Sequence, residues 1–286
     1  MTSLSPNAAA SRSIRRLVRG QAASDGAGVR LTRLLGHETV ELADPFLMLD
    51  HFDTENADDY IGGFPEHPHR GFETVTYMLA GRMRHGDNKG HSGVIASGDV
   101  QWMTAGGGII HSEMPEQDQG LMRGFQLWVN LPARDKMVPA RYQEIPAASI
   151  PVEVRDGSTV KVVAGMTSQG TAGPIDSGAT AARFFDIRLQ PGARLEEALP
   201  GDLTAIAVVY DGAIRVGDSA PVASVNVAIL GQGPSVVLEN TGSVEAGVLL
   251  IAGRPLNEPV AWGGPFVMNT RDEVMQAARD YQAGRF

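Results

Sequence analysis

The chain has 286 residues with 33 acidic and 24 basic side chains, and its formal net charge of -9 argues against a nucleic-acid groove, because phosphate binding needs a clustered positive field. Hydrophobic residues make up 43% and charged residues 20%, which is typical of a globular protein long enough for two domains. The absence of cysteine excludes disulfides and thiolate metal sites, and without an apolar run of 18 residues we expect no membrane-spanning helix.

The first 20 residues carry no apolar core. They are rich in arginine, serine and alanine, so they do not form a secretory signal, and a transit peptide is the alternative that the composition allows. We expect residues 1–12 to form a disordered N-terminal tail and the protein to be cytoplasmic.

Short strands separated by turns dominate the rest of the chain. Its 34 glycines and 17 prolines favour many turns over long helices. Alternating and β-branched runs predict strands at 13–18, 28–34, 44–52, 74–79, 100–104, 121–131, 152–155, 159–165, 182–189, 204–210, 213–216, 223–230, 235–239 and 246–252.

This rhythm predicts an all-β protein of two sandwich-like or small β-barrels in tandem. Four prolines between residues 132 and 151 mark a connector, and we place the domain boundary near residue 145. The first domain is expected to span 13–145 and the second 146–286. Thr270 and Glu273 fit a capping box, which predicts a helix at about 271–283 that docks on a barrel exterior.

Two pairs of candidate metal ligands lie in the first half. His67 and His69 are two residues apart, as are His111 and Glu113, so on a strand each pair projects to one face. A barrel can bring the pairs together, and three imidazoles with one carboxylate form a divalent metal site that keeps open positions. All seven histidines lie at or before position 111, so the second half cannot hold a site of this kind. The alternative for such pairs is exposed or structurally bonded histidines.

The remaining histidines have ordinary structural explanations. We expect His37 and His51 to be surface or structural residues. His85 and His91 lie near a turn and are expected to be exposed to solvent. Arg70 follows the first histidine pair and points to the other face of its strand, so we expect it to form a salt bridge.

The residues around the ligands resemble two motifs of the cupin superfamily. Gly63, His67, His69, Glu73 and Gly81 resemble the first motif, and the stretch 98–111 resembles the second, with Gly98-Asp99, Gly106 and His111 at the motif positions. Longer stretches resemble the pirin family: Gly-Gly-Phe-Pro-Glu-His-Pro-His-Arg-Gly-Phe-Glu-Thr-Val at 62–75, and those at 98–106, 110–115, 126–131 and 264–270.

The resemblance implies two cupin barrels of the jelly-roll type with one iron in the N-terminal barrel. The four ligands of the family fall on His67, His69, His111 and Glu113. Glu73 occupies the position of the usual cupin carboxylate ligand. In pirins the carboxylate ligand follows the last histidine, so we expect Glu73 to lie behind the ligands.

The resemblance also implies a function. Pirins act on flavonols such as quercetin as dioxygenases, so we expect oxidative ring cleavage of a flavonol with dioxygen, and Glu113 as the proton acceptor. Fe(II) is the expected metal, with manganese, nickel, copper and zinc as alternatives. The alternative function is a non-enzymatic, redox-sensitive iron protein that binds a transcription factor or a metabolic enzyme. A third is an isomerase or another small-molecule cupin enzyme. We expect no direct contact with nucleic acid or membrane.

Overall fold

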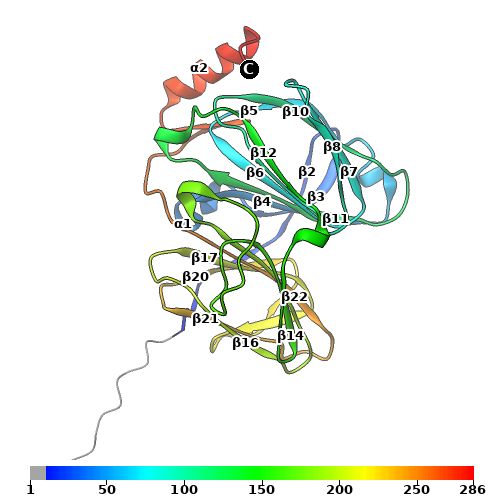
Figure 1. Ribbon diagram of the computed structural model, residues 1–286, viewed down its shortest axis with the longest axis vertical. Helices are drawn as coiled ribbons and strands as arrows, with labels where there is room; N and C mark the ends of the chain where they lie inside the picture. Colours follow the sequence, from blue (N-terminus) through cyan, green and yellow to red (C-terminus); the bar gives the residue numbers. More distant parts are fainter. Residues whose placement is uncertain (1–10) are drawn as a thin grey trace, which may run out of the picture.

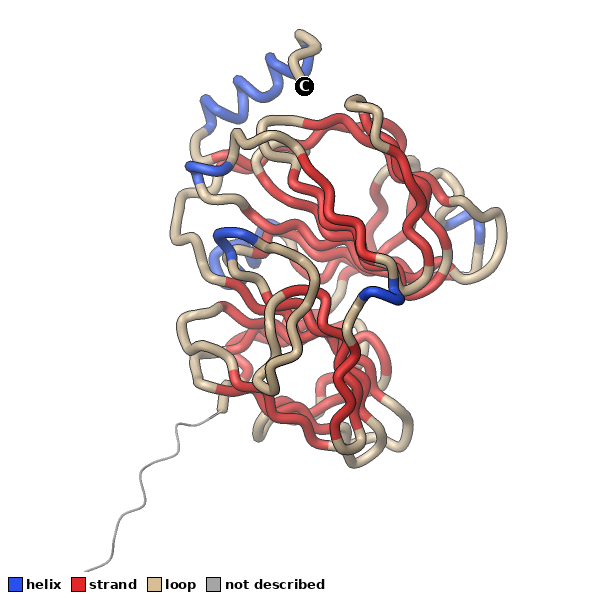
Figure 2. The backbone as a smooth tube through the Cα atoms, in the orientation of Figure 1, coloured by secondary structure: helices blue, strands red, loops and turns tan. Residues whose placement is uncertain are grey.

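The chain folds into two β-barrels that lie one above the other, in a computed structural model that describes residues 11–286 (Figure 1). Strands make up most of the fold and helices are few and short (Figure 2). The predicted all-β tandem of barrels is therefore confirmed. Residues 1–10 of the predicted tail, which was expected to span 1–12, lie outside the described residues. No helix among residues 11–286 is both long and apolar enough to cross a membrane.

The N-terminal barrel consists of a seven-stranded and a four-stranded sheet. In spatial order the large sheet contains β12 (Arg141–Ile145), β9 (Val100–Thr104), β6 (Phe72–Ala80), β11 (Met122–Asn130), β4 (Phe46–Thr54), β3 (Val29–Leu35) and β2 (Gln21–Asp25). The small sheet contains β5 (Phe64–His69), β10 (Ile109–Pro115), β7 (Arg82–Asp87) and β8 (Ser92–Ala96).

The C-terminal barrel has the same two-sheet construction. Its large sheet contains, in order, β1 (Ile14–Arg19), β20 (Asn226–Leu230), β17 (Thr204–Asp211), β22 (Ala246–Gly253), β15 (Arg183–Leu189), β14 (Ser158–Ala164) and β13 (Val152–Arg155). Its small sheet contains β16 (Arg194–Ala198), β21 (Ser235–Glu239), β18 (Ala213–Val216) and β19 (Val222–Ala223).

The helical elements connect or cover the strands. They are α1 (Val40–Ala43), α2 (Arg271–Gln282) and the 3-10 helices η1 (His37–Thr39), η2 (Ala57–Asp59), η3 (Ala133–Asp135), η4 (Ala147–Ser149) and η5 (Gly178–Thr180). Thr270 caps α2 through the predicted capping box with Glu273, so the helix begins where the sequence predicted.

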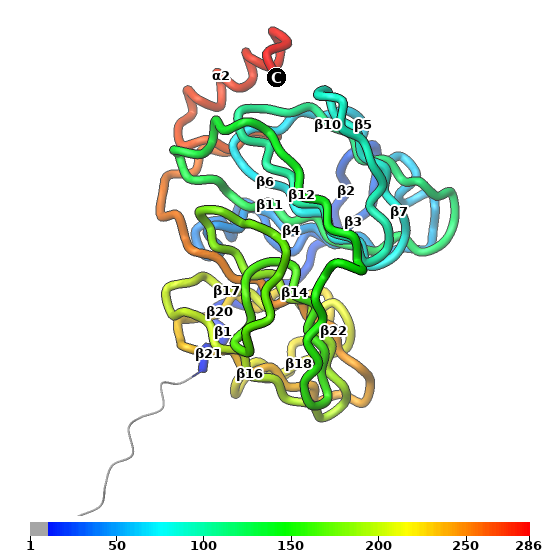
Figure 3. Tube along the Cα trace, in the orientation of Figure 1, coloured from blue at the N-terminus to red at the C-terminus, as the bar shows by residue number. Residues whose placement is uncertain are grey.

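The two barrels exchange their terminal segments, which the predicted domain limits did not anticipate. Strand β1 was assigned to the first domain, but it pairs with β20 of the C-terminal barrel (Figure 3). Arg12 was assigned to the tail, yet only 1% of it is exposed, because its guanidinium donates hydrogen bonds to backbone carbonyls of the C-terminal barrel. In the other direction, the chain after β22 returns to the N-terminal barrel as β23 (Ala261–Gly263), β24 (Phe266–Met268) and α2.

The two large sheets pack against each other. One apolar cluster contains Val75, Phe125 and Leu127 of the N-terminal barrel together with Ile206 and Leu249 of the C-terminal barrel. On strands, the residues between these apolar positions point to the opposite face. In the N-terminal barrel that opposite face is the barrel interior, where the predicted metal ligands lie.

Candidate metal centre

Three histidines converge inside the N-terminal barrel. His67 and His69 project from β5, and His111 projects from β10, where it is directly opposite His67 in the strand pairing. The ring centroids lie 4.4 Å apart for His67 and His111, 4.7 Å for His67 and His69, and 5.0 Å for His69 and His111. One ring nitrogen from each of the three lies within 4.8 Å of those of the other two, as required for a common metal ion.

The chemical state of these imidazoles fits a divalent metal. Nδ1 of His67 lies 2.7 Å from the carbonyl of Pro65, which leaves Nε2 for a ligand. Nδ1 of His69 and both ring nitrogens of His111 are buried without a hydrogen-bond partner among the described residues. Burial, together with the neighbouring histidines, lowers the pKa of His69 and of His111 well below the usual value. Neutral, otherwise unsatisfied imidazoles are the form that binds a metal.

Glu113 lines the same cavity, but its carboxylate is hydrogen-bonded to side chains of the large sheet. Its Oε1 is 2.9 Å from the hydroxyl of Thr76, and its Oε2 accepts a hydrogen bond of 2.9 Å from the amide of Gln126. Its oxygens are not within 4.8 Å of all three imidazole nitrogens. The structure therefore brings three of the four predicted ligands together and places the fourth beside them.

Thr76 and Gln126 belong to a polar row that crosses the inner face of the large sheet. Each residue of the row is opposite the next in the strand pairing, and side-chain hydrogen bonds join several of the neighbouring pairs. The row consists of Glu144, Gln101, Thr76, Gln126, Asp50 and Arg33. Arg33 and Asp50 form a two-pronged ion pair at 2.9 and 2.8 Å, which closes the row beside the cavity.

Two of the three histidines, His67 and His69, line a cavity of about 720 Å³, which is within the range of small-molecule sites. Aromatic rings form one wall: Trp128 is 5.2 Å from His69 and 5.6 Å from Trp262, and Trp262 is 3.9 Å from His37, measured between ring centroids. Phe52 and Phe64 also line the cavity. These rings would exclude water from an aromatic ligand and stack on it.

Glu73 does not lie behind the ligands, contrary to the prediction. On β6 it alternates with Thr74 and Thr76, so its side chain leaves the opposite face of the sheet, toward the other barrel. There its Oε1 accepts a hydrogen bond of 2.6 Å from Thr104, and burial raises its pKa. The motif position alone did not reveal the orientation of Glu73, because a carboxylate that follows a turn need not project from the same face of the sheet as the histidines before the turn.

The other histidines divide between expected and unexpected positions. His91 is exposed, as predicted, but His85 is 2% exposed, because it projects into the barrel opposite Glu113 and Gly93 leaves room for its ring. His51 is a structural residue that stacks on Phe125, and burial lowers its pKa to about 4. His37 lines the cavity. Arg70 forms the predicted salt bridge, to Asp280 at 2.7 Å.

Several residues of the site were missed from the sequence. Thr76 and Gln126 carried a usable signal, because both are polar residues at inward positions of otherwise apolar strands. Trp262 carried none, since it lies about 150 residues beyond the last histidine and reaches the cavity only through the returning C-terminal segment.

Two barrels of this construction, one of them holding three convergent histidines, define a two-cupin protein with a candidate metal centre. The sequence matches the Pirin family over residues 28–129 and the Pirin C-terminal cupin domain over residues 184–286. The chain belongs to the pirin family.

Similar proteins cover nearly the whole chain. It is 58% identical to the pirin-like protein of Caulobacter vibrioides over 96% of this chain and 99% of that protein. It is 41% identical to the pirin of Homo sapiens over 91% of this chain and 88% of that protein. A crystal structure of quercetin 2,3-dioxygenase from Acinetobacter baumannii superposes with a TM-score of 0.89 at 34% identity, covering 97% of this chain and 99% of the other.

Proposed function

We propose that this protein is a metal-dependent dioxygenase that opens the central ring of a flavonol such as quercetin. The observation that carries the proposal is the convergence of His67, His69 and His111, two of which line an aromatic-walled cavity. The similar structure named quercetin 2,3-dioxygenase supports the same choice of substrate. Trp128, Trp262, Phe52 and Phe64 all line the cavity and would contact a planar ligand there.

His67, His69 and His111 would hold the metal, for which we propose Fe(II), with manganese, nickel, copper and zinc as alternatives. Such a metal supplies Lewis acidity and one-electron chemistry toward dioxygen when it is bound. Three protein ligands leave positions for a deprotonated hydroxyl group of the substrate. Glu113 lies beside them, and each of its oxygens takes part in one hydrogen bond, with Thr76 or Gln126, and keeps a second lone pair for a ligand.

The hydrogen-bond pattern around Glu113 favours a role as proton acceptor. The single hydroxyl hydrogen of Thr76 faces two acceptors, Oε1 of Glu113 at 2.9 Å and Oε1 of Gln126 at 2.6 Å. A proton on Oε1 of Glu113 satisfies both contacts, because Glu113 then donates to Thr76 and Thr76 donates to Gln126. The substrate hydroxyl can therefore lose its proton to Glu113 without leaving a buried group unpaired.

The proposed reaction is balanced without another reactant. One flavonol and one dioxygen give one carbon monoxide and one depside, so no external reductant is consumed.

The decisive experiment measures quercetin absorbance and carbon monoxide release by the iron-loaded protein under air. We expect turnover that is abolished by a chelator and by His69→Ala, and that falls by about 10²–10⁴-fold in Glu113→Gln. His91→Ala is the matched control, because this histidine is exposed and lies outside the cavity. A fully iron-loaded protein that consumes no quercetin would refute the proposed substrate.

A non-enzymatic regulatory role needs only a metal-dependent surface and no cavity above the metal. The aromatic-walled cavity of about 720 Å³ therefore favours the enzyme. The two functions differ in a second measurement. A regulator predicts capture of a protein partner that changes between ferrous and ferric protein, even where no flavonol is consumed.

A further inference from the structure

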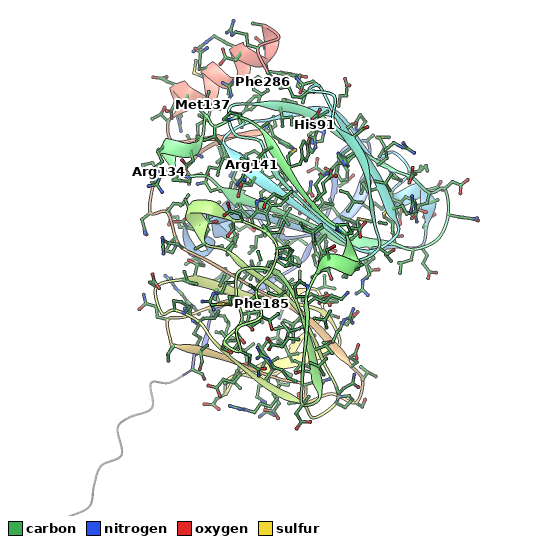
Figure 4. All side chains as sticks on the ribbon, in the orientation of Figure 1. His91, Arg134, Met137, Arg141, Phe185 and Phe286 are labelled. Carbon is green, nitrogen blue, oxygen red and sulfur yellow. The ribbon has the colours of Figure 1, made fainter. Side chains whose placement is uncertain are left out.

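The C-terminal strap, defined as residues 260–286, reaches both strands that carry the histidines. Its hairpin and helix return from the C-terminal barrel and end over the metal-bearing sheet. Figure 4 shows Phe286, the last residue, beside the end of α2 at the top of the N-terminal barrel. We propose that the strap is a positioning element for the metal site, in which Asp280 and Phe286 fix the strands of His69 and His111. The inference rests on the proposed metal site and not on the proposed substrate.

The strap holds β5 through Arg70, the residue directly after His69. The backbone of Arg70 pairs with the strap, donating to the carbonyl of Pro265 at 3.3 Å and accepting from the amide of Val267 at 3.0 Å. Its guanidinium donates to Asp280 of α2 at 2.7 Å and is only 4.4 Å from the centre of the Phe286 ring. Because Arg70 is 3% exposed, this contact is a fixed part of the interior.

The same guanidinium also holds the loop that leads into β10. Nε of Arg70 donates to the carbonyl of Gly107 at 2.7 Å. The Phe286 ring covers Gly108 so closely that a Cβ atom there would lie 2.9 Å from it. The position of this loop sets where β10 begins, and His111 follows three residues later.

Asn88 connects Phe286 with the strand of His111 directly. Its side-chain amide donates to the carbonyl of Phe286 at 3.0 Å, and its side-chain oxygen accepts from the amide of Ile110 at 3.1 Å. Ile110 precedes His111. The strap therefore holds the residue next to a candidate ligand on each of the two strands, directly at Arg70 and through Asn88 at Ile110.

These contacts are specific to the strap and go beyond covering a surface. Asp280 is ordered by three side chains, since it also accepts from Gln276 at 2.7 Å and from Arg285 at 3.0 Å. The hydrogen bonds from Arg70, Arg285 and Gln276 keep its pKa well below the usual value, so it remains a carboxylate. A fixed carboxylate and a fixed ring leave Arg70 one orientation, and metal ligands tolerate only small displacements.

The test compares metal affinity in the full chain carrying Asp280→Asn or Phe286→Ala. Cobalt(II) binding to the metal-free protein is measured by competition with a chelator, together with the absorption spectrum of the cobalt(II) form. We expect each variant to lose about 10–100-fold in affinity and to change the spectrum. Asp272→Asn, an exposed acid on the same helix, is the matched control and should bind as the wild type does.

The melting temperature of the metal-free protein separates positioning from mere stability. A positioning role predicts weaker cobalt(II) binding in variants that melt close to the wild type. Lower melting temperatures with unchanged affinity and spectrum would overturn the proposal. Failure of the wild type itself to bind cobalt(II) would overturn the metal site as well. Loss of quercetin turnover with normal cobalt(II) binding would count against the proposed substrate and leave the strap untouched.

Discussion

The two barrels share one construction and differ in what fills them. Each has a seven-stranded and a four-stranded sheet. The interior of the N-terminal barrel holds the three histidines, Glu113 and the polar row on the large sheet. The interior of the C-terminal barrel is filled by apolar side chains, among them Val160, Phe185, Ile187, Leu195, Ala207, Val209, Ile214, Val236, Leu238, Val248 and Leu250.

The difference shows that the same strand framework can serve as a core or as a site. Closely packed apolar side chains stabilise the C-terminal barrel and leave no room for a ligand. The N-terminal barrel has a cavity in place of part of that packing, and Thr76, Gln126 and Glu113 inside it are hydrogen-bonded to one another. We therefore expect substitutions in the two interiors to affect different properties.

The largest expected effect is on the C-terminal barrel. Phe185, which Figure 4 labels in this barrel, is fully buried, and Phe185→Ala should reduce the free energy of unfolding by about 3–5 kcal/mol. Urea unfolding of the metal-free protein measures this loss, and cobalt(II) affinity should stay unchanged. Phe64→Ala is the matched variant, because Phe64 lines the cavity and is only partly buried. Equal losses in both variants would contradict the distinction between the interiors.

The exchanged termini share a feature, because a buried cation donates hydrogen bonds to backbone carbonyls at each of them. Arg12 anchors the N-terminal segment to the C-terminal barrel through four hydrogen bonds to backbone carbonyls. Lys136 anchors the strap to the N-terminal barrel. Its Nζ donates to the carbonyls of Gly71 and Val267 at 2.8 and 2.9 Å and to Asn130 at 2.7 Å.

The second prediction concerns the pH dependence of that anchor. Burial lowers the pKa of Lys136 from 10.5 to about 8. Between these values the unfolded chain binds a proton that the folded protein does not, so the stability contributed by Lys136 rises with pH across this window and is lost as pH falls through about 8. Relative to Lys136→Met, the free energy of unfolding should rise by up to about 3 kcal/mol from pH 8 to pH 10.5.

Urea unfolding at several pH values measures this slope. Lys89→Met removes an exposed lysine of the same barrel and is the control, which should keep the slope of the wild type. If the difference in the free energy of unfolding between the wild type and Lys136→Met did not change with pH, the prediction would fail. Burial would then not lower the pKa of the Lys136 amine.

The contrast between the barrels was partly visible in the sequence. The clustering of all histidines before residue 112 assigned the candidate site to the first half, and strand alternation correctly paired His67 with His69. Alternation works here because it is local. It could not place Glu73, because the face that a strand presents after a turn depends on the register with β9 and β11.

The exchange of terminal segments could not be predicted from the sequence either, because it also depends on contacts between residues that are far apart in the chain. Strand β1 is polar on most of its length and pairs with a strand more than 200 residues later, so nothing local marks its barrel. The strap is likewise separated by the whole C-terminal barrel from the loop it contacts. No strand was predicted over β7 (Arg82–Asp87), although its inward-facing Met83 and His85 alternate with exposed arginines.

The smallest expected effects come from two single-group changes. One replaces a hydroxyl by a methyl group in the N-terminal barrel, and the other replaces a methyl by a hydroxyl group in the C-terminal barrel. Thr76→Val should cost about 1–2 kcal/mol in the metal-free protein, because Glu113 and Gln126 each lose their contact with the hydroxyl group. Val248→Thr should cost a similar amount, because Val248 is fully buried in the apolar cluster and the new hydroxyl has no side-chain partner there.

The two variants should differ in their effect on quercetin turnover. Thr76→Val removes the contact that orients the carboxylate of Glu113 and should slow quercetin turnover, whereas Val248→Thr should leave turnover unchanged. Thr76→Ser keeps the hydroxyl and should restore most of the rate, which separates the hydrogen bond from the loss of volume. If Thr76→Val were neutral in both stability and rate, the polar row would not support the site. The N-terminal interior would then be polar only because a cavity tolerates it.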